Sequence, residues 1–257
     1  MTSKRIKTKG TYEDGWATKT INLQIGCEHG CTYCYARRIF LNNGTIKTPE
    51  EFLEPRISKT AQKWLDRILQ GFNPFKKFDG RIMFPSTHDI TMNNYEDCLI
   101  LLNAILEAGN EVLIVTKGNF EAITRVAHDL QLYQDKVEFR FTITTYSDAM
   151  LEKYEPNAPD VEERFQTLTY IRNLNYKSSV SIEPFLLADV DKLVEILLTL
   201  VTECIFIGPM NPPSPELEWL YDKESLLEIK QKLEALNDPR IRFKDAFLKK
   251  LGDKDND

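Results

Sequence analysis

Short apolar runs alternate with longer amphipathic segments along this chain, and no other feature constrains its fold as strongly. Apolar runs bounded by turn residues favour strands, whereas apolar residues at helical spacing favour helices. We predict six strands, at 20–24, 81–84, 111–115, 137–143, 178–182 and 204–207. We predict six helices that alternate with them, at 57–70, 95–108, 120–132, 161–173, 189–200 and 215–236. This alternation is typical of βαβ units around a parallel sheet.

Six βα units are fewer than the eight of a closed barrel. The predicted fold class is therefore α/β, a partial, open (β/α)6 TIM-like barrel whose gap can admit a bulky substrate. With 257 residues and 42% hydrophobic content, the chain can bury one sizeable core. We predict a single domain over 1–257 with a flexible N-terminal arm and C-terminal tail, and a short final strand and helix within 240–251.

Three of the five cysteines, Cys27, Cys31 and Cys34, lie within eight residues. Cluster iron is held by thiolates, and a cubane iron–sulfur cluster offers four irons, so three clustered cysteines leave one iron without a protein ligand. Such an open coordination position is where a substrate or cofactor binds. The other two cysteines, Cys98 and Cys204, lie in apolar stretches, and we predict that both are core residues.

Zinc and disulfide chemistry fit the three cysteines less well. His29 is the candidate fourth zinc ligand, but it lies between the first two cysteines, and no second Cys-x-x-Cys or histidine pair follows. An odd cluster of cysteines in a chain without a secretory segment indicates a reducing compartment. A non-catalytic iron–sulfur or zinc binding module, or a redox sensor, is the alternative to an enzyme.

The spacing Cys27-x3-Cys31-x2-Cys34, with the aromatic Tyr33 directly before the last cysteine, resembles the signature of the radical S-adenosylmethionine superfamily. The resemblance implies a [4Fe-4S] cluster on these cysteines, with S-adenosylmethionine bound at the open iron. It also implies an enzyme that cleaves this cofactor to methionine and a 5′-deoxyadenosyl radical, which takes hydrogen from a substrate. Tyr33 would pack near the adenine. An external one-electron reductant, similar to flavodoxin or ferredoxin, would be the partner.

Polar residues follow several predicted strands, at the carboxyl ends where the active sites of parallel α/β folds gather. S-adenosylmethionine carries an amino acid and a ribose, so binding it requires a cation, an acceptor and hydroxyl partners. The candidates of these types are Lys117, Ser86, Thr142, Thr144 and Glu183. The structural alternatives are a surface lysine, a turn or helix cap at Ser86, and a strand that ends at Glu183-Pro184.

The order of further motifs resembles the spore photoproduct lyase-related branch of this superfamily. These motifs are Tyr35-Ala-Arg-Arg38, Ser86-Thr-His-Asp89, Thr116-Lys117, Thr142-Ile-Thr-Thr145 and Glu155-Pro156, followed by Arg164. The resemblance implies cofactor contacts from Ser86 and Lys117. It makes Arg164 a further cofactor-side candidate, whose alternative role is a helix-surface arginine or a partner of Glu155.

A nucleic acid or nucleotide is the first candidate substrate by this resemblance, and a small metabolite or peptide is the second. The lyase has a hydrogen-donor cysteine shortly after its second barrel strand, where this chain carries Ser86, Thr87 and His88. Repair of thymine dimers is therefore not the expected reaction.

The formal net charge of −6 disfavours a large electrostatic footprint on nucleic acid, although local patches can bind phosphate. Two basic groups are present, Lys4, Arg5, Lys7 and Lys9 near the N-terminus and Arg240, Arg242, Lys244, Lys249 and Lys250 near the C-terminus. The longest apolar run, 193–201, is too short to span a bilayer, and the first ten residues lack the apolar centre of a signal peptide. We expect a cytoplasmic protein with no membrane partner.

Overall fold

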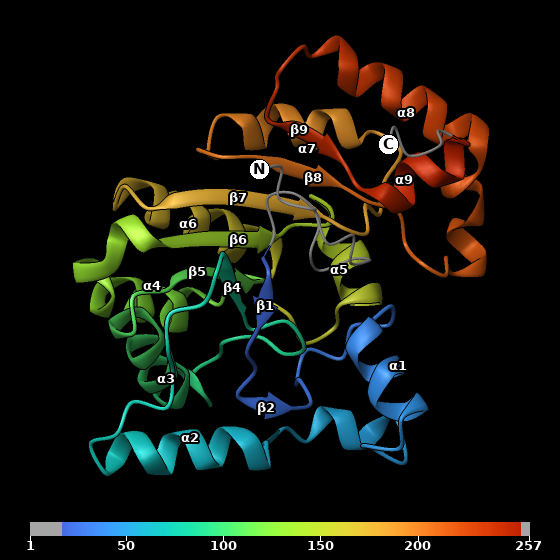
Figure 1. Ribbon diagram of the computed structural model, residues 1–257. Helices are drawn as coiled ribbons and strands as arrows, with labels where there is room; N and C mark the ends of the chain where they lie inside the picture. The colour runs from blue at the N-terminus through green and yellow to red at the C-terminus, as the bar shows by residue number, and fades with distance from the viewer. Residues whose placement is uncertain (1–16, 253–257) are drawn as a thin grey trace, which may run out of the picture.

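The computed structural model describes residues 17–252, and within them seven parallel strands form one sheet in the order β1-β4-β5-β6-β7-β8-β9 (Figure 1). The strands are β1 (Lys19–Thr20), β4 (Arg81–Phe84), β5 (Glu111–Thr116), β6 (Val137–Thr142), β7 (Lys177–Ile182), β8 (Ile205–Ile207) and β9 (Ile241–Phe243). Neighbours in the sheet follow one another along the chain, as in a closed barrel. No ladder joins β9 to β1 within the described residues, so the sheet is an open partial barrel, as predicted.

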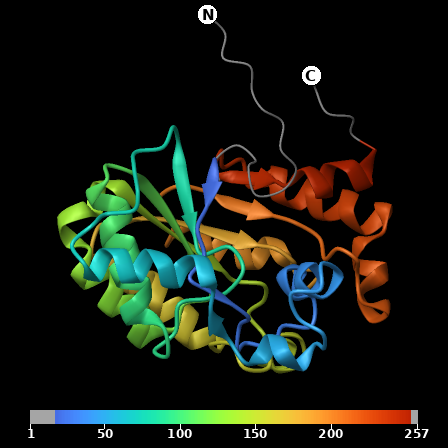
Figure 2. The ribbon, with the colours of Figure 1, turned by 60° about the horizontal axis from the view of Figure 1, so that its bottom comes forward.

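Helices cover the outer face of the curved sheet (Figure 2). They are α1 (Tyr35–Asn42), α2 (Lys59–Leu69), α3 (Tyr95–Glu107), α4 (Phe120–Asp129), α5 (Asp148–Tyr154), α6 (Val161–Asn173), α7 (Val190–Leu198), α8 (Lys223–Ala235) and α9 (Asp245–Leu251), with short 3-10 helices at Glu50–Leu53, Gln131–Lys136 and Pro215–Tyr221. Ser58, Asn119, Asp160 and Asp222 cap α2, α4, α6 and α8, each accepting a hydrogen bond from the backbone N–H three residues later. Within the described residues, no helix has the length and apolar character needed to cross a bilayer.

The two faces of the sheet differ in chemistry because side chains alternate along each strand. Outward-facing residues such as Ile82, Ile114 and Phe139 are fully buried against the helices, and each stabilises the fold by about 1.5–3 kcal/mol. The opposite, concave face is largely polar. By register it carries Arg81, Met83, Leu113, Glu138, Arg140, Thr142, Ser179, Ser181, Phe206 and Arg242.

Two predicted elements were wrong in their boundaries. The strand predicted at 20–24 is two strands: β1 ends at Thr20, and β2 (Gln24–Ile25) pairs antiparallel with β3 (Arg56–Ile57). The chain leaves the main sheet between them because the Leu23 N–H donates to Nε2 of His88 at 3.0 Å. The helix predicted at 215–236 is divided at Asp222, which caps α8.

The sheet has seven strands rather than the six of the predicted barrel. The extra one is β9, which pairs parallel with β8, and α9 follows it, as predicted for 240–251. The predicted N-terminal arm, with its basic residues, and the tail at 253–257 lie outside the described residues.

Candidate active site at the cysteine loop

The three clustered cysteines lie on the loop between β2 and α1. Gly26 opens this loop at φ +96°, and a Cβ added there would lie 2.7 Å from the carbonyl oxygen of Phe52. Only glycine fits such a position without displacing the backbone. At the other end, Cys34 is the N-cap of α1, and its Sγ accepts a hydrogen bond from the Arg37 N–H at 3.5 Å. The loop is therefore fixed at both ends.

Cys31 is buried, whereas Cys27 and Cys34 are partly buried. Burial raises the pKa of Cys31 to about 12, Lys117 opposes this shift, and Cys34 adds to it. Burial also raises the pKa of Cys27, and both other thiols contribute to that shift. The Cys34 N–H donates to the Cys31 carbonyl oxygen at 3.2 Å, and Cys27 and Cys34 pack against the same small core cluster, so the three residues lie near one another. Three neighbouring thiols that become thiolates on metal binding are the donor set of an iron–sulfur cluster, so these residues fit the cluster that the sequence predicts.

No three His, Cys, Asp or Glu side chains in residues 17–252 converge as ligands of a single metal ion do. The ligands of one ion converge within about 2.3 Å of a common centre. In a cluster each thiolate binds a different iron, so its ligands are spread more widely.

Four elements meet at the carboxylate of Glu155, which follows α5. The Tyr33 hydroxyl, from the cysteine loop, donates to Oε1 at 2.5 Å, and the Thr144 hydroxyl, after β6, donates to the same atom at 2.6 Å. Lys117, after β5, places Nζ 2.6 Å from Oε2, and Arg164, in α6, places Nη2 2.7 Å from it. One carboxylate thus contacts four predicted site residues. Glu155 itself was predicted only as part of a motif, with no role in cofactor binding.

The Glu155 side chain is 0% exposed, so its charge depends on these partners. Burial alone would raise its pKa, but Lys117, Arg164 and the hydrogen bonds from Lys117 and Thr144 hold that pKa well below its ordinary value. Two cations thus face the Glu155 carboxylate, and a second buried carboxylate, that of Asp89, lies near enough to the cysteine loop to raise the pKa of Cys27. The Lys117 ammonium uses two of its three donors on Glu155 and Tyr33, and it is 13% exposed.

Ser86 lies two residues after the end of β4, and Asn22 fixes its position. The Asn22 side chain accepts from the Ser86 N–H at 2.7 Å and from the Thr87 N–H at 3.0 Å, and it donates to the Ser86 hydroxyl at 2.9 Å. Asp89 then joins this turn to the next strand, because its Oδ2 accepts from the Lys117 N–H at 2.7 Å. Asn22 was predicted to be a strand residue, and no signal in the sequence indicated that its side chain would hydrogen-bond to Ser86 and Thr87.

Glu183 lies after β7, and its Oε2 is 3.5 Å from Nζ of Lys244. It packs on Gly208, where an added Cβ would lie 2.9 Å from its Cγ. Tyr35 connects this region to the other candidates. Its hydroxyl donates to the Ser86 carbonyl oxygen, and burial, then Cys34 and Glu183, raise its pKa.

Thr142 and Arg164, the two remaining candidates, contact each other. The carbonyl oxygen of Thr142, rather than its hydroxyl, has a described partner, Nη1 of Arg164 at 3.2 Å. Arg164 is 1% exposed and also donates to the Pro159 carbonyl oxygen at 2.8 Å. Its described contacts are those of a buried partner of Glu155, which was one of its structural alternatives.

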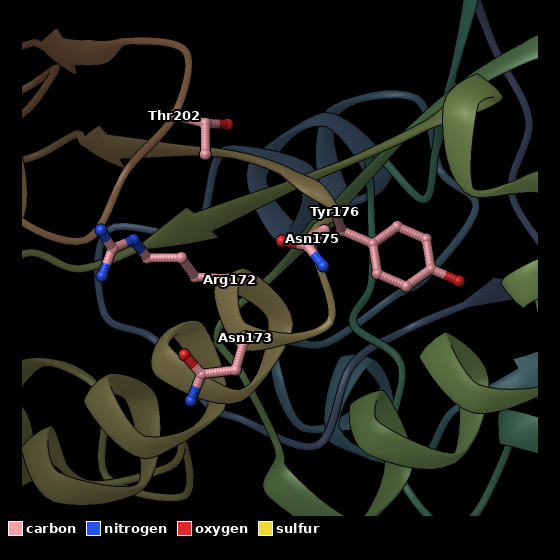
Figure 3. A pocket seen from close by; sticks show the side chains of 5 residues that line it. All are labelled: Arg172, Asn173, Asn175, Tyr176 and Thr202. Atoms are coloured by element: carbon pink, nitrogen blue, oxygen red, sulfur yellow. The ribbon is translucent and has the colours of Figure 1, made fainter.

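A separate hollow, lined by Arg172, Asn173, Asn175, Tyr176 and Thr202, lies near the amino ends of β7 and β8 (Figure 3). It contains none of the predicted site residues. The amino-terminal face of a barrel serves stability, whereas the carboxyl-terminal face carries the active site. We therefore place the candidate site at the cysteine loop.

No family model matches the chain. Over 248 residues it is 27% identical to an uncharacterised protein of Acidianus two-tailed virus, covering 89% of this chain and 77% of the viral one. Over 190 residues it is 24% identical to an uncharacterised protein of Methanocaldococcus jannaschii, covering 69% of this chain and 65% of the archaeal one.

Solved structures share the fold. Streptococcus suis SuiB bound to S-adenosylmethionine superposes with a TM-score of 0.57 at 14% identity, over 88% of this chain and 46% of SuiB. Spore photoproduct lyase complexed with dinucleoside spore photoproduct superposes with a TM-score of 0.57 at 15% identity, over 86% of this chain and 74% of the lyase. The chain therefore spans about half the length of SuiB. At these identities the comparison shows a shared fold, so this chain has the partial α/β barrel of these two structures.

Proposed function

We propose that this protein is a radical S-adenosylmethionine enzyme that holds one [4Fe-4S] cluster on Cys27, Cys31 and Cys34. The observation that carries the proposal is the gathering of predicted cofactor residues around Glu155, next to the cysteine loop. When bound, the cluster supplies the electron for reductive cleavage of the S-adenosylmethionine sulfonium. An external reductant of the flavodoxin or ferredoxin kind would deliver that electron.

The residues around Glu155 divide into contacting and positioning groups. We assign Lys117 to the carboxylate of the cofactor, because it is a partly exposed ammonium with a donor left for a ligand. Ser86 and Glu183, at the ends of β4 and β7, are the hydroxyl and the acceptor for the rest of the cofactor, and Tyr33 packs near the adenine. Arg164 is buried, so we assign it to holding Glu155 rather than to contact with the cofactor.

The substrate we propose first is a nucleic acid or nucleotide. The similar spore photoproduct lyase structure holds a dinucleoside spore photoproduct, which supports this class. A SuiB structure with a TM-score of 0.61 holds a precursor peptide, which makes a peptide the second candidate.

The test is anaerobic reconstitution with iron and sulfide, reduction, and measurement of 5′-deoxyadenosine formed from S-adenosylmethionine. We expect Cys27→Ala, Cys31→Ala and Cys34→Ala each to lose both iron content and cofactor cleavage. Cys98→Ala is the matched control, because Cys98, in α3, is 0% exposed in the core and lies outside the loop. A fully loaded protein that neither binds nor cleaves S-adenosylmethionine would instead support a non-catalytic binding module or redox sensor.

A further inference from the structure

Positive charge is concentrated in residues 59–77, which form α2 and the loop after it and which the proposed cofactor site does not use. This segment contains one carboxylate, that of Asp66, and five exposed cations, Lys59, Lys63, Arg67, Lys76 and Lys77. Five cations less one carboxylate leave a net charge of +4 over these residues, whereas the whole chain carries −6. We call the exposed side of this segment the α2 surface.

The cations of the α2 surface are not neutralised by neighbours. None of the five side chains forms a hydrogen bond or ion pair with a residue of 17–252. The Asp66 carboxylate accepts from Nε2 of Gln62 at 2.9 Å instead. Other exposed helices pair their cations within the helix, as Lys232 does with Glu228 at 2.7 Å. The α2 surface therefore differs from an ordinary solvated helix face.

The loop after α2 folds back along the helix. The ring of Phe75 packs against the ring of Trp64 in α2, with 5.3 Å between the centroids. The Asn110 side chain holds the loop from the other side, because its Nδ2 donates to the Lys76 carbonyl oxygen at 3.1 Å. Lys63 and Lys76 are the chain neighbours of the two packed rings. The loop thus brings its own cations beside those of α2.

An aromatic ring is exposed at the carboxyl end of the same helix. Phe72 is 61% exposed, and its N–H donates to the Arg67 carbonyl oxygen at 2.9 Å, which fixes its backbone beside the last turn of α2. Cations that track a phosphate backbone, together with an aromatic ring on which a base stacks, are the features that bind single strands. A duplex offers such a ring no free base face, because its bases are stacked on one another.

The α2 surface begins next to the cysteine loop. The N–H of Ser58, the N-cap of α2, donates to the Leu23 carbonyl oxygen at 3.0 Å, just before β2. The Phe52 carbonyl oxygen, just before β3, accepts from the Cys27 N–H at 2.8 Å. α2 lies at the lower edge of the molecule in Figure 1 and at the front in Figure 2, and no other element covers its outer side. A polymer bound along α2 therefore reaches the neighbourhood of the proposed cofactor site.

We propose that the α2 surface binds single-stranded nucleic acid, with its cations on the phosphates and Phe72 stacked on a base. This inference rests on the proposed function and gives its first substrate class a binding surface outside the cofactor site. Contacts to phosphates hold a strand in position without reading its sequence. The α2 surface is therefore expected to bind strands of different sequence.

The test is fluorescence anisotropy of a labelled oligodeoxythymidine of about 15 nucleotides with the full-length protein at several salt concentrations. We expect binding that weakens as salt rises, because each cation on a phosphate releases a counterion. Lys63→Gln combined with Lys76→Gln should weaken binding about tenfold or more at low salt. The slope of log K against log salt should become shallower by about 1.4, since each contact to a single strand contributes about 0.7.

Matched controls separate the α2 surface from exposed charge and apolar area in general. Lys249→Gln combined with Lys250→Gln removes the same charge from exposed positions of α9 and should leave affinity and slope unchanged. Phe72→Ala should weaken binding about tenfold without changing the slope, because it removes stacking and no charge. Leu132→Ala, at a side chain that is 91% exposed, should leave binding unchanged.

Equal losses in the two double variants, or an unchanged slope in Lys63→Gln with Lys76→Gln, would overturn the proposal. An acidic reductant is the other partner that positive charge attracts. If the wild type binds no oligonucleotide, and the Lys63 and Lys76 double variant loses 5′-deoxyadenosine formation with flavodoxin but not with dithionite, the α2 surface binds the reductant and the proposal is wrong.

The same titration in Cys27→Ala separates this proposal from the proposed function, because strand binding requires neither cluster nor reductant. Binding in Cys27→Ala that depends on Lys63 and Lys76 supports the α2 surface even where 5′-deoxyadenosine formation is absent. A wild-type protein that cleaves S-adenosylmethionine but binds no oligonucleotide overturns the α2 surface alone.

Discussion

The ammonium nitrogen of Lys117 lies 2.6 Å from Oε2 of Glu155, and the carboxylate it contacts is completely buried. The same oxygen lies 2.7 Å from Nη2 of Arg164. One side chain therefore sets the positions of a cation after β5 and a cation in α6. Glu155 acts on the proposed cofactor through these neighbours, as a positioning residue.

Glu155→Gln should strongly destabilise the fold. It leaves the buried Arg164 and the partly exposed Lys117 without their counter-charge, and breaking a buried ion pair costs about 3–5 kcal/mol. Urea unfolding measures this loss. Glu216→Gln is the control, because it removes the exposed ion pair with Lys153. Exposed pairs contribute little, so its unfolding midpoint should stay at the wild-type value, and equal losses in the two variants would contradict the role of Glu155.

Lys117→Met should weaken S-adenosylmethionine binding to the reconstituted, unreduced protein about tenfold or more, because a charge-assisted hydrogen bond to the cofactor carboxylate is lost. Equilibrium dialysis under anaerobic conditions measures the affinity. Thr144→Val removes a hydrogen bond to Glu155 but keeps both cations, and we expect it to weaken binding much less. If the two substitutions have the same effect, Lys117 acts only by holding Glu155.

His88 should make stability depend on pH below neutrality. Its Nε2 accepts the Leu23 N–H at 3.0 Å and its Nδ1 lies 2.9 Å from the Asp89 carbonyl oxygen, so the ring is neutral. Burial lowers the pKa of His88 from 6.5 to about 4. The unfolded chain therefore takes up a proton before the folded one does. The resulting stability is complete above pH 6.5 and falls by about 3 kcal/mol as the pH drops toward 4.

Urea unfolding at pH 7.5 and pH 5 checks this prediction. His88→Gln retains an acceptor for the Leu23 N–H but has no ring to protonate, so its stability should change less between the two pH values than that of the wild type. His128→Gln alters an imidazole that is 72% exposed and should keep the wild-type pH dependence. An equal pH dependence in the wild type and His88→Gln would contradict the assignment.

The order of strands and helices along the chain could be predicted from the sequence. The spacing of apolar residues that distinguishes a strand from a helix is a local property of each segment. Cys204 is buried, as predicted, at 3% exposure, but its Sγ lies 3.6 Å from Nη2 of Arg140 on the concave face rather than against the helices. Strands covered on both faces are apolar nearly throughout, so the run around Cys204 does not indicate which residues face the barrel interior.

The role of Glu155 could not be predicted from local sequence patterns either. Its partners Tyr33 and Lys117 are 122 and 38 residues away in the chain, and only the folded sheet brings them together. The sequence feature that pointed to Glu155 was the Glu155-Pro156 motif, which Arg164 follows nine residues after Glu155. It indicated an ion pair between Glu155 and Arg164 but gave no connection to the cysteine loop.

Gly26→Ala should reduce cluster retention without removing any ligand. At φ +96°, a Cβ would lie 2.7 Å from the Phe52 carbonyl oxygen, so the backbone that leads into Cys27 must shift. Gly44→Ala is the matched control, since Gly44 also has a positive φ, of +72°, but an added Cβ would meet no atom within 4 Å. Both variants carry the backbone strain of alanine at positive φ, about 1–2 kcal/mol. Only Gly26→Ala should lower the ratio of iron to protein after reconstitution, because only there does the loop have to move; equal iron content in the two variants would show that the cysteine loop tolerates displacement.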